Sequence, residues 1–309
     1  MPIMHIPSTI RLLAAVCVLA AAGAASAGTT PDPAYLDELG KWRARANESL
    51  TRERGWLSII MRDELVPGVN RIGSAPGNDV VLPKTMARAH LGTIVVDKDK
   101  ARLTLAPGQK MRAVVKGDAG EEFTARDLVT GAEPVEWVTA GRLSLQIVKR
   151  EDGKFVLRAA DRESPRRKNF AGRLWYEPNT DYKLPARFVP HAVGATIPIA
   201  NVRGEISYEK VAGSLEFALN GQKISLDALD DDGNLFIIFR DGTSGNGTYP
   251  PGRFLYVERP KDGVWSVDLN KAFNPPCAFS AFTTCPLPPP QNWLKTSVPV
   301  GERYIEKKF

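Results

Sequence analysis

The first pattern along the chain is an unbroken run of apolar and small residues from Leu12 to Ala25. It follows the cation Arg11 and ends in Ala25-Ser26-Ala27, the small-residue site typical of signal cleavage. A membrane anchor would need about 20 strongly apolar residues, whereas this run is short, rich in alanine and followed by Gly28-Thr29-Thr30-Pro31. The pattern predicts a cleavable signal at residues 1–27, and hence a periplasmic or secreted protein without a stable membrane span.

Residues 28–55 have the periodicity of one amphipathic helix. Asp32-Pro33 supplies a capping side chain and a proline at the first helical position. Apolar residues then recur every three or four positions, at Tyr35, Leu39, Trp42, Ala46 and Leu50, before Gly55. We expect this stripe to pack against the rest of the chain; docking onto a partner is the alternative.

From Trp56 the pattern changes to short apolar or alternating runs that glycine, proline, asparagine and aspartate interrupt. Examples are Trp56–Ile60, Val80–Leu82, Leu91–Val96, Leu103–Leu105, Arg112–Val115, Leu143–Val148 and Phe155–Leu157. This spacing is typical of a β-sandwich or barrel. It predicts a β-sandwich over residues 56–160, with a domain boundary in the charged stretch 161–168, which contains Pro165.

Residues 169–309 predict a second, antiparallel β-unit, so the fold class is mainly β. Runs at 205–211, 214–219 and 222–226 form a meander if Ala212-Gly213 and Asn220-Gly221 are tight turns. The uniformly apolar run 235–239 predicts a central strand. Two further strands are expected at residues 254–257 and 264–269.

Regular structure should stop after Asn270, because prolines cannot donate to a sheet ladder. Apolar residues remain dense there, at Phe273, Phe279, Phe282, Leu287 and Trp293. We therefore expect residues 274–292 to form an ordered, proline-rich C-terminal cap over an open end of the second β-unit; a polyproline recognition peptide is the alternative. Cys277 and Cys285 predict a disulfide in an exported chain, with free thiols as the alternative.

Charge argues against a nucleic-acid partner. The chain has 41 basic and 35 acidic residues, a formal net charge of +6, and the basic residues are spread among the acids. We predict no metal site, since His90 and His191 are far in sequence from the cysteines and the acidic loop at 227–234 lacks the spacing of a calcium loop. No cofactor motif is present, and we expect none to be bound.

The densest polar cluster is the glycine-rich segment 240–253. Glycines let backbone N–H groups approach a ligand, and arginine suits carboxylate or phosphate. Together with Asn274 and Asn292 of the cap, the predicted ligand-binding residues are Arg240, Asp241, Thr243, Thr248, Tyr249 and Arg253. The alternative is a structural turn in which Asp241 bonds its own backbone and the arginines pair with acids.

A hydrolase would need a base and a nucleophile. Gly242-Thr243-Ser244-Gly245 misses the Gly-x-Ser-x-Gly pattern by one position. His191 is the candidate base, with Asp241 or Ser244 as its partner, and these groups should then lie within hydrogen-bond reach.

Two resemblances add expectations. Asn70-Arg71-Ile72-Gly73-Ser74, Asn78-Asp79-Val80-Val81-Leu82-Pro83 and Arg88-Ala89-His90 resemble the forkhead-associated domain, a β-sandwich that binds phosphothreonine. Ser74 and Ala87 stand where that family has the phosphate-contacting arginine and serine. The resemblance therefore implies the sandwich without phosphothreonine binding, and a scaffold role for His90.

The second resemblance covers most of the mature chain. Its main motifs are Gly55-Trp56-Leu57, Phe239-Arg240-Asp241-Gly242-Thr243-Ser244-Gly245, Asn274-Pro275-Pro276-Cys277-Ala278-Phe279 and Cys285-Pro286-Leu287-Pro288-Pro289-Pro290-Gln291-Asn292. They are similar to the bacterial and archaeal family catalogued as domain of unknown function number sixteen eighty-four, which brings no activity with it. Two hypotheses remain: a binding or interaction protein for a small anionic or amphiphilic ligand beneath the cap, or the hydrolase with His191.

Overall fold

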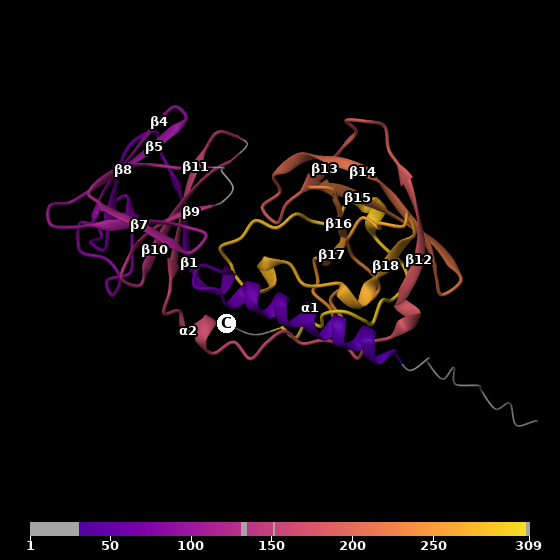
Figure 1. Ribbon diagram of the computed structural model, residues 1–309. Helices are drawn as coiled ribbons and strands as arrows, with labels where there is room; N and C mark the ends of the chain where they lie inside the picture. The colour runs from indigo at the N-terminus through magenta and orange to yellow at the C-terminus, as the bar shows by residue number, and fades with distance from the viewer. Residues whose placement is uncertain (1–30, 131–134, 151, 307–309) are drawn as a thin grey trace, which may run out of the picture.

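The computed structural model describes residues 31–130, 135–150 and 152–306. The predicted signal at residues 1–27 lies outside the described residues. The chain forms two β-units, and one long helix runs beneath the second of them (Figure 1). The predicted fold class, mainly β with an N-terminal helix and antiparallel sheets, is confirmed.

The first β-unit is a sandwich. A six-stranded sheet has the order β1-β11-β10-β9-β6-β7 and a five-stranded sheet the order β3-β2-β4-β5-β8. The strands are β1 (Ile59–Leu65), β2 (Gly68–Gly73), β3 (Val80–Val81), β4 (Gly92–Asp97), β5 (Lys100–Leu105), β6 (Met111–Val115), β7 (Asp118–Phe123), β8 (Ala125–Leu128), β9 (Glu136–Ala140), β10 (Leu143–Lys149) and β11 (Phe155–Asp161). Ile72 and Leu103 of the smaller sheet share one buried core with Leu145 and Leu157 of the larger, which makes the two sheets the layers of one sandwich.

The second β-unit is one seven-stranded sheet. Its order is β17-β16-β15-β14-β12-β18, with β13 added on β14. The strands are β12 (Lys183–Pro190), β13 (Thr196–Ala200), β14 (Ile206–Leu219), β15 (Gln222–Asp231), β16 (Asn234–Phe239), β17 (Arg253–Val257) and β18 (Trp265–Asp268). The apolar strand β16 lies between β15 and β17, as its sequence predicted.

Strand β14 corrects one turn of the predicted meander. Asn220-Gly221 is a hairpin turn, with φ of 51° and 74°, but Ala212-Gly213 lies inside β14, at a bulge between Val211 and Gly213. The strand pairs with β13 before the bulge and with β12 after it. Glycine is needed because a Cβ at Gly213 would collide with the Val189 carbonyl oxygen, so close packing rather than chain reversal explains this residue.

The proline-rich segment 274–292, which we call the cap, is ordered. It contains the 3₁₀ turns η4 (Pro276–Ala278) and η5 (Pro290–Asn292). Cys285 packs with Ile238 and Phe254 on the outer face of the sheet, and the Leu287 backbone N–H donates to the Ala200 carbonyl at 2.7 Å. The cap thus covers a sheet face rather than the open end that we expected. Cys277 and Cys285 lie at disulfide distance, as predicted, with Cα atoms 6.1 Å apart.

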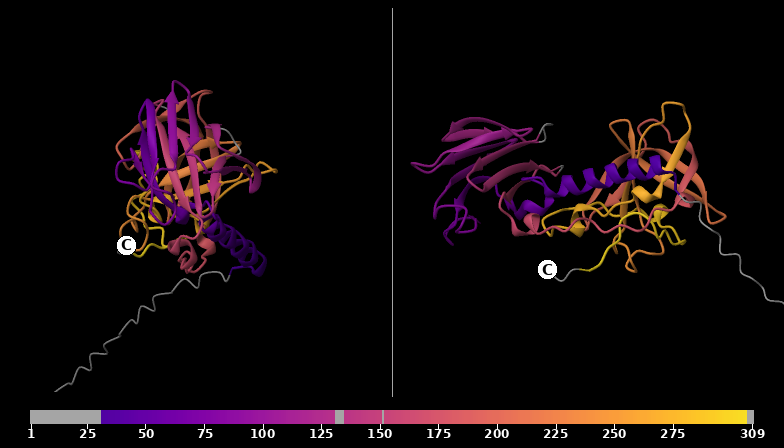
Figure 2. Two further views of the ribbon diagram at one scale, coloured as in Figure 1. Left: turned by 90° about the vertical axis from the view of Figure 1, so that its left-hand side faces the viewer. Right: turned by 60° about the horizontal axis from the view of Figure 1, so that its bottom comes forward.

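Helix α1 (Pro33–Thr51) precedes the sandwich in sequence but packs on the second β-unit. Asp32 caps it by accepting from the Ala34 backbone N–H at 3.2 Å. The Tyr35 hydroxyl donates to Asp268 at 3.0 Å, and the Trp42 ring lies 5.4 Å from that of Trp175. Figures 1 and 2 show α1 running under the second unit and ending beside the sandwich. No helix among the described residues is long and apolar enough to cross a membrane.

The stretch 161–168, where we expected the domain boundary, is anchored. Asp161 accepts from Arg142 Nε at 2.8 Å, and the Ser164 hydroxyl donates to the Leu57 carbonyl at 2.8 Å. The short helix α2 (Pro165–Lys168) follows. The chain therefore passes between the two units through a packed segment.

Candidate functional site

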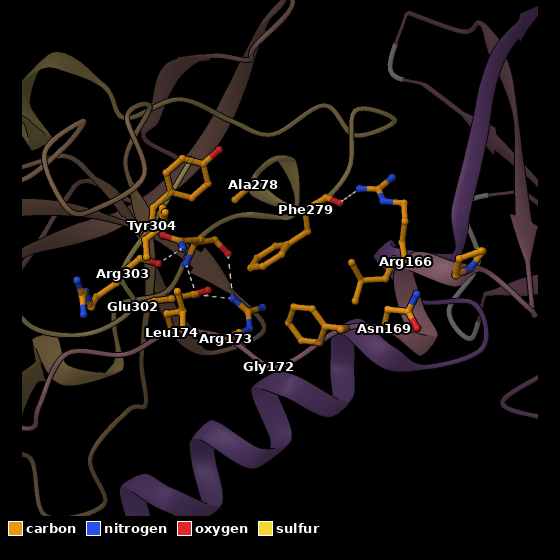
Figure 3. Close-up of a pocket in the computed structure, with 15 residues that line it drawn as sticks. Arg166, Asn169, Gly172, Arg173, Leu174, Ala278, Phe279, Glu302, Arg303 and Tyr304 are labelled. Atoms are coloured by element: carbon orange, nitrogen blue, oxygen red, sulfur yellow. Dashed lines mark hydrogen bonds and ion pairs between the residues drawn. The ribbon is translucent and has the colours of Figure 1, made fainter. Parts of the chain in front are cut away.

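A pocket of about 320 Å³ opens where four segments meet. Its lining comes from the 3₁₀ turn η1 (Trp56–Ser58), α2 with the segment after it, the cap and the C-terminal segment 302–305. Figure 3 shows Arg173 and Glu302 facing one another at one end, with Phe279 and Arg166 toward the other. The pocket thus lies partly beneath the cap, between segments that are remote in sequence.

One end of the pocket holds a buried ion pair. The side chains of Arg173 and Glu302 are 5% and 1% exposed, and Arg173 Nη1 lies 2.5 Å from Glu302 Oε2. The Asn274 backbone N–H also donates to Glu302 Oε2, at 2.7 Å. Burial raises the pKa of Glu302 to about 7, against the opposing effects of Arg173 and Asn274. This carboxyl group can therefore gain or lose a proton near neutral pH.

Asn274 adds an acceptor at the same end. Its side-chain N–H donates to the Arg303 carbonyl at 2.9 Å, while its Oδ1 is buried without a hydrogen-bond partner among the described residues. A buried carbonyl oxygen without a donor is costly. A ligand donor reaching it would remove that cost.

Aromatic side chains line the pocket beside this ion pair. The rings of Phe170 and Phe279 meet edge to face with centroids 6.0 Å apart. The Arg173 guanidinium lies 4.8 Å from the Phe279 ring centroid, and Arg166 donates to the Phe279 carbonyl. Arg303 is a third cation in the lining, against the single carboxylate Glu302. The arrangement suits a ligand with an apolar body and an anionic group.

The glycine-rich turn forms an internal network instead of an open site. Arg253 is fully buried and donates through Nη2 to Asp241 Oδ2 and to the Val298 carbonyl, each at 2.9 Å. Asp241 Oδ1 accepts from the Thr243 hydroxyl at 2.6 Å, and that hydroxyl lies 2.9 Å from the Thr248 hydroxyl. These contacts match the structural alternative for this turn. They fasten it to the C-terminal segment.

The other predicted ligand-binding residues lie at three places. Arg240 lies over the Trp293 ring at 5.1 Å. Tyr249 packs against Tyr304, a pocket residue, with ring centroids 4.9 Å apart. Asn292 is buried and bonds the backbone of β15 and β16, at the Asp227 and Ile238 carbonyls. Of the predicted set, Asn274 alone lines the pocket.

His191 meets partners other than those we expected. Its Nε2 lies 3.1 Å from the Ser214 hydroxyl and 3.3 Å from Asp227 Oδ1, and Ser214 donates to Asp227 at 2.6 Å. Ser244 instead accepts, through its hydroxyl, from the Asp241 backbone N–H at 3.1 Å. Within the described residues, His191 therefore forms no hydrogen bond with Asp241 or Ser244. No group of three or more metal-ligating His, Cys, Asp or Glu side chains forms there either.

Sequence reasoning missed Arg173, Glu302 and Phe170. Arg173 and Glu302 are 129 positions apart, and neither belongs to a motif. The sequence feature that pointed toward this pocket was the density of aromatic residues in the cap, which include Phe279.

The fold and site define a β-rich protein in which the short helix α2, the segment after it and a proline-rich cap line a small amphiphilic pocket. Residues 168–303 match the model of the family described as "Protein of unknown function (DUF1684)" and belong to that family, as the Cys-Pro motif predicted. The solution NMR structure of the uncharacterized protein from gene locus rrnAC0354 of Haloarcula marismortui is 33% identical, with a TM-score of 0.37. The alignment covers 45% of this chain and 79% of that one. No curated protein matches the chain. The resemblance to the forkhead-associated domain stays a prediction.

Proposed function

We propose that this is an exported binding protein that accepts a small amphiphilic anion in the pocket beneath the cap. The observation that carries the proposal is the composition of the lining. It combines the aromatic rings of Phe170 and Phe279 with three arginines and the single carboxylate of Glu302. An apolar tail would lie against the rings, and its anionic group would face the cations.

The test uses octanoate as the probe and octanol as its uncharged counterpart, each titrated calorimetrically into the mature protein. We expect octanoate to bind and octanol to bind more weakly. Phe279→Ala should weaken octanoate binding about tenfold or more, because a large apolar contact is lost. Phe282→Ala, a cap phenylalanine outside the pocket lining, is the matched control. Equal loss in both variants, or no binding by the parent, would contradict the proposal.

Export rests on the signal pattern at residues 1–27 and on the paired cysteines, which suit an oxidising compartment. We expect the protein recovered from the periplasm to begin at Gly28. N-terminal sequencing that finds Met1, Met4 or a lipidated Cys17 would argue against this location.

The hydrolase has weaker support. In a catalytic triad the histidine receives the nucleophile's proton on one nitrogen and is oriented through the other. Here the same nitrogen of His191 faces both Ser214 and Asp227, and Ser214 donates to the carboxylate instead. This arrangement supplies a polar cluster on the surface without an activated nucleophile.

A further inference from the structure

A second cleft, of about 430 Å³, lies between the sandwich and the start of β14. The sandwich contributes Arg62, Lys149, Arg150 and Arg158, and the second unit contributes Glu205 and Ser207. Arg62 on the edge strand β1 is the direct cross-strand partner of Arg158 on β11. Residues that are paired in this way project from the same face of a sheet.

The carboxylates around the cleft form ion pairs with cations other than Arg62 and Arg158. Glu64 pairs with Lys154 at 2.8 Å, and Arg150 pairs with both Asp152 and Glu205, at 3.0 and 2.7 Å. Lys149 pairs with Asp99 outside the cleft. Within residues 31–130, 135–150 and 152–306, this leaves Arg62 and Arg158 as the cleft cations without an ion pair.

Both guanidinium groups are also short of hydrogen-bond acceptors. Their Nε atoms are buried and have no partner among the described residues. Arg158 stacks on Trp56, with its guanidinium 5.4 Å from the ring centroid. Burial, and then the neighbouring Arg62, lower the pKa of Arg158. Two like charges in cross-strand register destabilise a sheet. Glu205 and Glu64 act on Arg62 from a distance, against the stronger effects of Arg203 and Arg150, but neither carboxylate forms an ion pair with Arg62 or Arg158.

We propose that Arg62 and Arg158 together bind an oxyanion, the phosphate or carboxylate group of a polar small molecule seated in this cleft. An anion between them would supply acceptors for both guanidinium groups and cancel their repulsion. The cleft shares no lining residue with the pocket beneath the cap. It has no aromatic residue in its lining, which includes charged side chains and the hydroxyls of Ser207 and Thr284.

The experiment is a calorimetric titration of the mature protein at constant ionic strength with inorganic phosphate and, separately, with citrate. We expect saturable binding of at least one of them, and the comparison tells a phosphate preference from a carboxylate preference. Arg158→Gln and Arg62→Gln should each weaken binding about tenfold or more. Arg102→Gln is the control, since Arg102 is also a strand arginine of the sandwich but pairs with Asp127 at 2.7 Å.

Thermal unfolding is a second readout, independent of calorimetry. In chloride buffer, Arg62→Gln should raise the melting temperature, because it removes the repulsion, and phosphate or citrate should raise that of the parent but not of the variant. Because Arg62 lies on an edge strand, we expect Arg62→Gln to fold. This variant therefore still tests the proposal if Arg158→Gln does not fold. Phe279→Ala should leave this binding unchanged, which separates the site from the pocket beneath the cap. Absence of binding of both anions, or equal binding by parent and both cleft variants, would overturn the proposal.

Discussion

Among the described residues, Arg253 is the largest side chain that is completely buried. Besides Asp241 and the Val298 carbonyl, it donates to the Val300 carbonyl. It thus holds the C-terminal segment, where Val298 and Val300 join the core of the second β-unit. A charge in such a place is tolerated because its partners are fixed around it.

Replacing Arg253 with methionine should destabilise the protein by about 3–5 kcal/mol, because it leaves the Asp241 carboxylate buried without its cation. Urea denaturation measures the loss. The double variant Arg253→Met, Asp241→Asn should recover part of it, since the stranded charge is gone. A loss below about 1 kcal/mol would mean that Asp241 finds other compensation.

Glu302 should make stability depend on pH. Its folded pKa of about 7 lies above the ordinary glutamate value of 4.5, so between these values the folded state binds more protons than the unfolded state. Stability therefore falls as pH rises from about 4.5 to about 7, by up to about 3 kcal/mol. Denaturation at several pH values, with Glu302→Gln as the reference, isolates this contribution. A parent and variant whose stabilities run parallel across this window would show that Glu302 keeps an ordinary pKa.

The orientation of single side chains could not be predicted from the sequence. The segment 240–253 was recognised as polar and glycine-rich, but its sequence does not show whether the Arg253 side chain points to solvent or into a core. The Arg173–Glu302 ion pair joins residues 129 positions apart, so only the tertiary structure reveals it. By contrast, Cys277 and Cys285 are close in sequence, and an even pair at that spacing sufficed to predict that they lie at disulfide distance.

At the scale of elements, α1 was predictable because its apolar stripe repeats with the helical period. What the stripe could not tell was its partner: Tyr35 reaches Asp268 and Trp42 reaches Trp175, both in the second β-unit. Likewise, the sequence analysis predicted two strands separated by a turn at Ala212-Gly213 where the structure has the single strand β14. Glycine occurs both in turns and at sites of close packing, and the sequence does not distinguish the two.

The docking of α1 gives a matched pair of variants. Leu39 is 1% exposed and Leu36, on the same helix, is 40% exposed. Leu39→Ala should cost about 2–5 kcal/mol as a buried large-to-small change, whereas Leu36→Ala should cost well under about 1 kcal/mol. Thermal or urea unfolding compares them. Similar effects of both changes would mean that α1 does not depend on this contact.

At the scale of the whole molecule, α1 and the segment after β11 join the two units. Arg167 of α2 donates to the Thr51 carbonyl at the end of α1, and Arg162 binds Glu53 through two contacts of 2.9 Å. Arg150 of the sandwich reaches Glu205 of the second unit. Composition suggested a domain boundary at 161–168 because charge and proline are typical of linkers. In the folded chain the charged side chains of this stretch form ion pairs or donate to backbone carbonyls.

This packing predicts the order of proteolytic cuts. Limited digestion with a protease of broad specificity should first nick the exposed loop between β12 and β13, where Val193 is fully exposed, and cut 161–168 later. Cleavage requires local unfolding, and the buried residues Asp161 and Ser164 must leave their partners for it. Mass spectrometry of the earliest fragments gives the order. Ser164→Ala, which removes the bond to the Leu57 carbonyl, should speed cutting at 161–168 while leaving the loop at Val193 unchanged. If the parent is cut first within 161–168, the two units are joined by a flexible boundary, and the contacts across it contribute little to holding them together.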